Sequence, residues 1–366
     1  MRIVNVTYKR FPEQSDPVTW IDGFRLHYGI WETIATQQEV IFLESINYTG
    51  TIERRGIKYL FQKQTAATLR WPFRLNRQIA ALKPDVVMIH SLAFPVQVIL
   101  LRLQLGRKVR IVVQHHAEQA FRHPLKKLVQ RITDLCVQAY FFTSEGLAAP
   151  WVQARLIRKN KVREVMEVSS VFQQEDKTHA RQITGMADIS NYLWVGHLNA
   201  NKNPLLIVQS FIRFISETPT DASLYMIFQS ESLLPGIKQL LAAHPAAAQQ
   251  IHLVGKVPHA QLQAWFSAAD FIISSSFYEG SGVAVCEGMS CGCIPLLTDI
   301  PSFRFMTGGN CGFLYEPGNE EALLKALQQS YEADRRQAEQ ATLKQYREHL
   351  SFEAIAAKIQ EVLSSL

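Results

Sequence analysis

The stretch of sequence that decides the fold runs from residue 269 to residue 295 and reads ADFIISSSFYEGSGVAVCEGMSCGCIP. Residues 269–275 form a short apolar run rich in Ile and Phe, which is typical of a buried strand. Gly280 and Gly282 follow in a loop that can approach a ligand closely, and the pattern from 281 to 291 is helical. The segment therefore predicts a strand, a loop and a helix, with Glu279 in the loop and Glu287 inside the helix.

This arrangement suits a ligand that carries both negative charge and hydroxyl groups. A loop that opens a helix presents free backbone N–H groups and the positive end of the helix dipole, which attract a phosphate or diphosphate. The carboxylates of Glu279 and Glu287 would not attract a bare anion, but their oxygens can accept hydrogen bonds from sugar hydroxyls. A sugar nucleotide satisfies both requirements. The competing interpretations are that Glu279 caps the helix and that Glu287 is an ordinary acid on the helix surface.

The rest of the chain alternates strands with helices in two series. In the first half we expect strands at 3–7, 39–43, 85–90, 109–115, 137–143 and 163–168, with helices around 25–37, 73–82, 95–105, 124–133 and 145–154. After a polar, linker-like stretch at 172–190, strands are expected at 192–195, 223–228, 251–254, 270–274 and 294–297, and helices at 204–216, 233–243, 260–268, 282–291 and 320–331. Such a rhythm is typical of mainly parallel sheets covered on both faces.

The sequence therefore predicts two α/β domains, because 366 residues exceed the usual size of one core. Residues 1–172 form the first domain and residues 173–350 the second. Residues 333–366 look wholly helical, and the apolar stripe of the last helix, 351–366, is expected to pack back on the first domain. Ligands of open α/β sheets bind beyond the carboxyl ends of the strands, so we expect a site in the cleft between the domains.

Composition and cysteine usage limit the class of protein. A content of 47% apolar and 19% charged residues is ordinary for a soluble globular protein, and no apolar run is long enough to span a bilayer. The N-terminus lacks a signal-peptide pattern, so a cytoplasmic protein is expected. Five cysteines, three of them in a C-x4-C-x-C cluster at 286–293, predict free buried thiols and no zinc site.

The charge is distributed unevenly along the chain. Residues 1–172 contain 25 Lys and Arg against 13 Asp and Glu, whereas residues 173–366 contain 13 against 19. The basic first half is either a solvated face or a surface that meets an anionic membrane or a phosphorylated substrate. No nucleic-acid-binding motif accompanies it. Trp71-Pro72-Phe73, between two arginines, could touch a lipid interface, but packing in the core or a loop is the favoured interpretation.

Two further candidate segments follow predicted strands. Residues 195–204 read VGHLNANKNP and place Lys202 just before a helix that Pro204 opens. A lysine there can neutralise a phosphate with a point charge. His115 and His116 end a strand of the first domain, where one of them is expected to be structural and the other to line the cleft.

Taken together, these segments resemble the retaining glycosyltransferases of family 4, which have the GT-B fold of two Rossmann-like domains. The family pattern V-G-R-L-x-x-x-K-[GND] corresponds to VGHL at 195–198 with Lys202-Asn203, and its E-G-F-x-x-x-x-x-E-A-M-A-C-G-x-P-V corresponds to residues 279–295. Asp299 and NCGFLYEPGN at 310–319 match the two later motifs. The resemblance is strong over about 190–320, and in the first half only the architecture matches.

The resemblance implies a role for each matched residue. Lys202 would hold the donor diphosphate, Glu279 would orient the transferred sugar and stabilise charge at its anomeric carbon, and Glu287 would accept hydrogen bonds from the ribose. His116, with His115 as the alternative, would lie near the sugar. The remaining donor-binding residues are Gly196, His197, the amides around Ser281, Gly282 and Val283, and the loop with Lys256 and Val257, which would border the base.

The sequence departs from the family pattern in several places. His197 stands where the family has an Arg that binds the diphosphate, so Arg304 or Lys256 is a candidate substitute cation. Phe305 replaces a Glu of many members, Phe228-Gln229-Ser230 replaces a more glycine-rich turn, and the first-domain glycine pair is reduced to Asp22-Gly23.

The expected protein is a metal-independent glycosyltransferase that needs no cofactor. It would move sugar from a UDP- or GDP-sugar to a glycan or lipid-linked acceptor in cell-surface polysaccharide biosynthesis, at the inner face of a membrane. The alternatives are a nucleotide-sugar epimerase, a phosphorylase, or a degenerate member that binds without catalysis. A hydride-transferring enzyme is disfavoured because no G-x-G-x-x-G follows the first strand.

Overall fold

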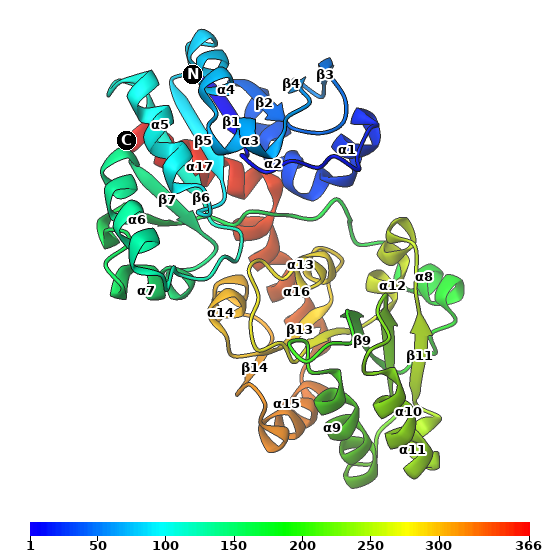
Figure 1. Cartoon of the computed structure of the whole chain (residues 1–366). Coiled ribbons are helices and arrows are strands. Elements are labelled where there is room, and N and C mark those ends of the chain that lie inside the picture. The colour runs from blue at the N-terminus through cyan, green and yellow to red at the C-terminus, as the bar shows by residue number, and fades with distance from the viewer. The chain divides into compact units, whose positions relative to one another are not determined.

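The structure is a computed structural model that describes all 366 residues of the chain. It divides into two compact units, Met1–Ser169 together with Phe352–Leu366, and Ser170–Ser351 (Figure 1). Each unit is built on one mainly parallel sheet with helices packed on it, which confirms the predicted α/β class. The domain boundary expected after residue 172 lies within three residues of this division.

The first unit contains an eight-stranded sheet in the order β3-β4-β2-β1-β5-β6-β7-β8. All neighbouring strands are parallel except β3 and β4, which form an antiparallel hairpin at one edge. The central strands are buried on both faces, which explains their nearly continuous apolar sequences. The strands are β1 (Arg2–Val6), β2 (Glu39–Glu44), β3 (Gly50–Arg54), β4 (Ile57–Phe61), β5 (Val86–His90), β6 (Arg110–Gln114), β7 (Ala139–Phe142) and β8 (Val162–Glu164).

The helices of the first unit include one from the far end of the chain. Helix α17 packs against α2 through its buried apolar stripe, so the end of the chain belongs to this unit (Figure 1). Helix α5 packs against both α4 and α6. The helices are α1 (Pro17–Gly23), α2 (Arg25–Ala35), α3 (Ala66–Arg70), α4 (Phe73–Ala81), α5 (Pro95–Leu105), α6 (Pro124–Cys136), α7 (Glu145–Gln153), the short η1 (Lys159–Lys161) and α17 (Phe352–Ser365).

The second unit contains a six-stranded, fully parallel sheet in the order β11-β10-β9-β12-β13-β14. This is the doubly wound order of dinucleotide-binding folds, in which the winding direction reverses between the two central strands. Here those strands are β9 and β12. The strands are β9 (Ser190–Gly196), β10 (Ala222–Phe228), β11 (Ile251–Gly255), β12 (Phe271–Ser274), β13 (Ile294–Thr298) and β14 (Phe313–Tyr315).

The helices of the second unit begin within the stretch that was expected to be a linker. Asp176 accepts a hydrogen bond from the His179 backbone N–H and so caps α8. The helices are α8 (Lys177–Thr184), α9 (Pro204–Glu217), α10 (Leu234–Ala243), α11 (Pro245–Ala248), η2 (His259–Gln261), α12 (Leu262–Ala268), α13 (Val283–Ser290), α14 (Pro301–Thr307), α15 (Glu320–Glu332), α16 (Arg335–Gln345) and η3 (Tyr346–Leu350).

The structure differs from the expected local structure in three places. The β3–β4 hairpin, which turns at Arg55-Gly56 with both residues at positive φ, was missed because its strands are short and partly exposed. The helical stretch expected over 333–366 breaks at Ser351, which is extended. Trp71 and Phe73 do not pack in a core, because each is 54% exposed. None of the helices has the length and apolar character needed to cross a bilayer.

Candidate active site

Two loops lie together where the strand order of the second sheet reverses. β9 and β12 are paired there, with Tyr192 beside Phe271. Residues 197–203 connect β9 to α9, and residues 275–282 connect β12 to α13. The carboxyl ends of strands at such a switch point are the usual ligand site of doubly wound sheets. Both segments singled out in the second half of the sequence therefore fall at the same place.

Hydrogen bonds hold these two loops in one platform. Lys202 Nζ lies 2.5 Å from Glu279 Oε1, and only 26% and 12% of the two side chains are exposed. Asn201 Nδ2 donates to the Tyr278 carbonyl at 2.9 Å, and Ser275 Oγ donates to the Lys202 carbonyl at 2.8 Å. The lysine and the glutamate that the sequence placed in one site are thus in direct contact.

This ion pair leaves capacity for a ligand on both partners. A lysine ammonium has three N–H donors and a carboxylate has two acceptor oxygens, so one shared hydrogen bond leaves each group able to bind a further atom. Glu279 does not cap the next helix, because the residue at the N-cap of α13 is Gly282 and no side chain caps that position. The site therefore offers a positive donor and a negative acceptor side by side.

The first turn of α13 presents uncapped backbone N–H groups beside this pair. Gly282 has φ +56°, a conformation that favours glycine, and a Cβ there would lie 2.8 Å from the Phe303 ring. Ser281 is half-buried and Val283 is exposed. Since the amides at a helix start have no partners within the helix, residues 281–283 form a place where an anion can bind.

Glu287 is not a surface acid. It is 2% exposed on α13, and its Oε1 lies 2.6 Å from His259 Nε2. The hydrogen bond to Glu287 raises the pKa of His259, and the Phe172 ring lies against the imidazole with centroids 4.9 Å apart. A buried carboxylate with one imidazole partner retains acceptor capacity for hydroxyl groups.

The other predicted donor-side residues occupy the same edge of the sheet. Gly196 ends β9, and His197 after it is exposed. Lys256 and Val257 follow β11, and this loop leads into His259 and so reaches α13. Arg304, a candidate replacement cation, forms a close ion pair with Asp299.

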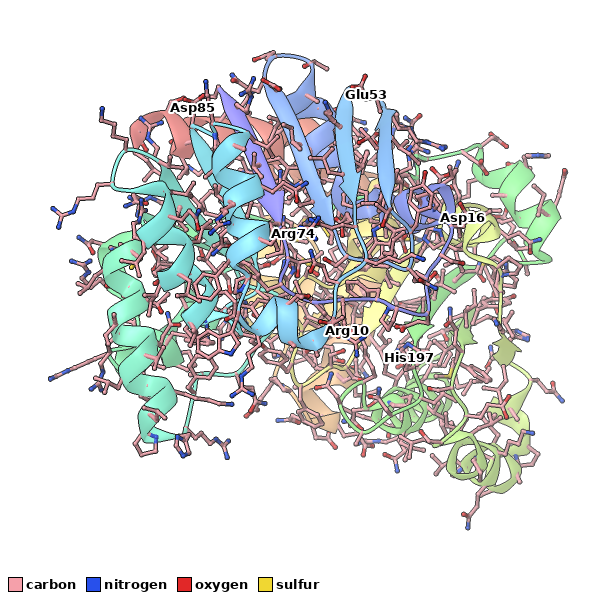
Figure 2. All side chains as sticks on the ribbon, turned by 45° about the horizontal axis from the view of Figure 1, so that its top comes forward. Arg10, Asp16, Glu53, Arg74, Asp85 and His197 are labelled. Carbon is pink, nitrogen blue, oxygen red and sulfur yellow. The ribbon has the colours of Figure 1, made fainter.

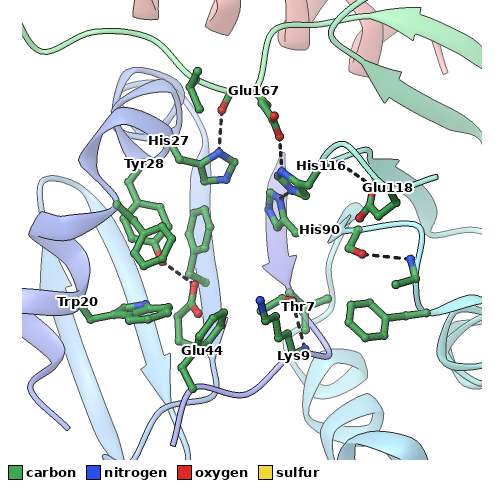
Figure 3. Close-up of a pocket in the computed structure, with 18 residues that line it drawn as sticks. Thr7, Lys9, Trp20, His27, Tyr28, Glu44, His90, His116, Glu118 and Glu167 are labelled. Atoms are coloured by element: carbon green, nitrogen blue, oxygen red, sulfur yellow. Dashed lines mark hydrogen bonds and ion pairs between the residues drawn. The ribbon is translucent and has the colours of Figure 1, made fainter. Parts of the chain in front are cut away.

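The first unit has a cavity of about 580 Å³ near its own switch point, between β1 and β5 (Figure 3). In Figure 2, Arg10 after β1 lies at the opposite end of the sheet from Asp85, which precedes β5. The cavity is therefore at the carboxyl edge of the sheet. Side chains from strands, helices and loops line it, including Lys9, Trp20, His27, Tyr28, Glu44, His90, His116, Glu118 and Glu167.

His116 lies in this cavity as part of a histidine cluster. Its Nδ1 forms a close ion pair with Glu167, and its Nε2 lies 3.2 Å from His90 Nδ1. His90 Nε2 lies 3.0 Å from the Asn5 side-chain oxygen, and His27 Nδ1 lies 2.8 Å from the Glu167 carbonyl. The result is a continuous hydrogen-bonded chain from Glu167 to Asn5.

The three imidazoles differ in their affinity for a proton. Burial lowers the pKa of His27 to about 4 and holds the pKa of His90 well below its ordinary value. Burial also opposes charge on His116, but the carboxylates of Glu167 and Glu118 outweigh it and raise its pKa. His116 therefore binds a proton more readily than His27 and His90, and in its protonated form it can donate one N–H to Glu167 and the other to His90.

The opposite wall of the cavity combines aromatic rings with a buried acid. Trp20 and Phe24 have ring centroids 4.4 Å apart. The Tyr28 hydroxyl donates to Glu44 Oε1 at 2.7 Å, and burial raises the pKa of Glu44 to about 7. A wall of this kind can pack against the C–H face of a ring and accept hydrogen bonds from its hydroxyls.

His115, the alternative to His116, has a structural position. It is 2% exposed and stacks on Phe142, with Nε2 2.9 Å from the Glu118 carbonyl. Sequence reasoning missed His259, Glu44 and the partners of His116. His90 was open to detection, because it ends a predicted strand as His116 nearly does. Glu44 and His259 gave no local signal.

The match to a known protein family falls within the second unit. Residues 190–333 match the family Glycosyl transferases group 1. EpsD of Bacillus subtilis (strain 168), provisionally named a glycosyltransferase, is 25% identical over 216 residues, which are 57% of this chain and 54% of EpsD. The chain thus spans about half the length of this relative. The Escherichia coli O-antigen chain mannosyltransferase B is 31% identical over 84 residues, 23% of this chain and 22% of that protein.

A solved structure resembles the whole chain. Anabaena HepE in complex with UDP has a TM-score of 0.72 and 13% identity, with all of both chains covered. At this identity the likeness concerns the fold, and it confirms the predicted GT-B architecture. The structure contains no group of three or more His, Cys, Asp and Glu side chains placed to hold a metal ion.

Proposed function

We propose that this protein is a retaining glycosyltransferase of family 4, because residues 190–333 match the family Glycosyl transferases group 1. Its donor is a nucleoside-diphosphate sugar carrying uridine or guanosine. HepE, a protein of the same fold, was solved with UDP, which supports a nucleotide of this kind. The acceptor is a glycan or a lipid-linked sugar of a cell-surface polysaccharide, and the similarity to an O-antigen chain mannosyltransferase supports this class.

The observation that carries the proposal is the contact between Lys202 and Glu279 beside the uncapped start of α13. A nucleotide sugar needs positive donors for its diphosphate and acceptors for its hydroxyls. Lys202 and the amides of residues 281–283 supply the donors, and Glu279 and Glu287 supply the acceptors. One local region of the second unit therefore offers every type of group that the donor requires.

In the proposed reaction, the bond between the anomeric carbon and the diphosphate oxygen breaks, and a bond to the acceptor hydroxyl oxygen forms on the same face of the sugar. The hydroxyl proton leaves with the nucleoside diphosphate. Lys202 and the helix start stabilise the negative charge that develops on the leaving group, and Glu279 stabilises the positive charge at the anomeric carbon. These fixed positive groups stabilise the leaving group as a divalent metal ion would, so transfer proceeds without a metal ion.

The first unit supplies the acceptor side of the reaction in this proposal. Its cavity has the aromatic wall and the buried Glu44 that suit a sugar ring (Figure 3). His116 lines the same cavity and is only partly buried.

The test is sugar transfer and nucleotide binding by two variants. In Lys202→Ala we expect kcat/KM to fall at least 100-fold, the typical cost of one charge-stabilising group, and UDP or GDP to bind more weakly. In Glu279→Gln we expect a similar loss of transfer with nucleotide binding retained. Lys325→Ala, which removes an exposed lysine of α15, is the matched control and should behave like the unaltered protein.

Two results would overturn the proposal. Unchanged sugar transfer in both Lys202→Ala and Glu279→Gln would remove these residues from the chemistry. Conversion of the donor to an epimer or free sugar, with no transfer to any acceptor, would assign the protein to another reaction of this fold. Melting temperatures of both variants establish that the losses come from the site and not from unfolding.

A further inference from the structure

Helix α6 of the first unit is turned the opposite way from an ordinary surface helix. Its fully buried residues are polar, namely Gln130, Thr133 and Asp134. Four of its large apolar side chains, Leu125, Leu128, Ile132 and Leu135, are between 44% and 72% exposed, and Val129 is half-buried. Their spacing of three, four and three residues aligns them in one stripe. An ordinary surface helix turns such an apolar stripe toward the protein core and its polar side toward water.

Specific contacts hold the helix in this orientation. Thr133 Oγ1 donates to the Pro95 carbonyl at 2.9 Å. The Asp134 carboxylate accepts from Arg158 Nε at 2.6 Å. Rotating the stripe inward would leave these polar groups without their partners, at the cost of buried hydrogen bonds and an ion pair. The exposed stripe is therefore a fixed feature of the fold.

The neighbouring helices also expose apolar side chains. Helix α5 lies between α4 and α6, and it exposes Val96 and Leu103, two turns apart on one side. Trp71 and Phe73 are exposed where α4 begins. Eight of the fifteen exposed large apolar residues of the chain thus lie between positions 71 and 135. We name these eight residues the α4–α6 surface.

The same helices are basic and almost free of acids. Asp134 is the single carboxylate within α4, α5 and α6, and it is buried and paired. The basic residues on these helices that are exposed or half-buried and form no ion pair are Arg74 (labelled in Figure 2), Arg77, Arg102, Lys126, Lys127 and Arg131. The surface therefore pairs apolar side chains with uncompensated positive charge.

We propose that the α4–α6 surface docks on an anionic lipid membrane. Leu, Phe and Trp side chains enter the boundary between headgroups and acyl chains, while Lys and Arg beside them meet anionic headgroups. This inference extends the proposed function, since it would hold the acceptor-binding unit at the membrane that carries a lipid-linked acceptor. Binding to lipid can nevertheless be tested without any donor or acceptor.

The charge argues against a second copy of the chain as the occupant. In a twofold dimer the same surface meets itself, so two positive surfaces without carboxylates would face each other and repel. A nucleic acid would use the positive charge but not four exposed aliphatic side chains on one helix, because bases stack on aromatic rings.

The test is co-sedimentation of the full chain with vesicles. We expect binding to vesicles of 30% phosphatidylglycerol in phosphatidylcholine, much weaker binding to phosphatidylcholine alone, and a decrease with added salt. Leu125→Gln with Leu135→Gln should weaken binding at least tenfold. Lys126→Gln with Lys127→Gln should weaken it about 30-fold, since each lysine near an anionic surface contributes about a factor of five.

Matched controls come from the second unit. Ile183→Gln removes an apolar side chain that is 60% exposed on α8, and Lys238→Gln with Lys325→Gln removes the same charge. Both controls should bind vesicles like the unaltered protein. All variants should bind UDP or GDP unchanged, so a defect in the donor site is distinguished from a defect in docking.

Three outcomes would overturn the inference. The first is no binding of the unaltered chain to phosphatidylglycerol vesicles at low salt. The second is unchanged binding by the α6 variants. The third is a dimer in solution that the Leu125→Gln, Leu135→Gln variant dissociates, which would assign the surface to a second copy. Vesicle binding without any nucleotide binding would instead refute the proposed function and leave the docking surface standing.

Discussion

The replacement of Glu287 by Gln tests the donor site at its most buried charge. Glutamine keeps the size of the side chain and one acceptor oxygen but removes the negative charge. A hydrogen bond to a charged group contributes roughly 1.5–3 kcal/mol and one to a neutral group roughly 0.5–1.5 kcal/mol. The midpoints of these ranges differ by about 1.25 kcal/mol, which predicts that the variant binds UDP or GDP close to tenfold more weakly, because a ribose hydroxyl loses its charged acceptor.

The assay is calorimetry with the nucleotide and with its 2′,3′-dideoxy analogue. In the unaltered protein we expect the loss of the ribose hydroxyls to cost at least the same factor of ten, whereas in Glu287→Gln it should cost much less. Glu321→Gln, at a largely exposed position of α15, is the matched control. Equal penalties for the analogue in both proteins, or binding of the nucleotide within twofold, would refute the assignment of Glu287 to the ribose.

The pH dependence of stability tests the contact between Glu287 and His259 independently. Because Glu287 raises the pKa of His259 in the folded state, the stabilisation from this pair is fully present below about pH 6.5, the ordinary histidine value. It is lost as pH rises through the raised pKa. His259→Gln should therefore lower the melting temperature at pH 6 and have little effect at pH 9. The expected difference is only about 1–2 °C, since the imidazole is half exposed and well screened.

Two further predictions concern stability. Burial raises the pKa of Glu44 to about 7, so its protonated form favours the fold below pH 4.5 and that stabilisation is lost as pH rises to 7. Glu44→Gln should remove a decline in unfolding free energy of about 3 kcal/mol between pH 4.5 and pH 8, measured by urea denaturation; an unchanged decline would contradict the burial argument. Gly282→Ala should destabilise the protein by about 2 kcal/mol, through positive φ and contact with Phe303. Gly236→Ala in α10, where a Cβ meets only ordinary contacts at 3.5 Å, should instead be neutral or stabilising.

The meeting of Lys202 and Glu279 could be predicted from the sequence because each residue lies in a short segment that follows a strand. Lys202 and Glu279 each follow one strand within a few residues, and the doubly wound order brings those strand ends together. The same rule located His116 at the end of a strand. Local pattern and global topology agree here, so each segment could be recognised by itself.

The wall of the first-unit cavity could not be predicted in this way. Trp20, Glu44 and Glu167 come from a helix, a strand and a loop that are distant in sequence, and each has a common structural interpretation. Glu44 ends a buried strand, and only the fold shows that it meets the Tyr28 hydroxyl and no cation. His259 likewise acquires its meaning only through the carboxylate of α13.

Helix α6 shows a different limit of sequence patterns. Periodicity identified a helix at 124–133 and, by itself, implies that the apolar stripe faces the core. A period fixes which residues share a side, but it does not fix which side faces inward. Here the polar residues have the better partners inside, since Thr133 binds the Pro95 carbonyl and Asp134 binds Arg158. The leucines are left outside, on helices whose unpaired charges are all positive, and this combination is the physical basis for expecting a lipid surface as their partner.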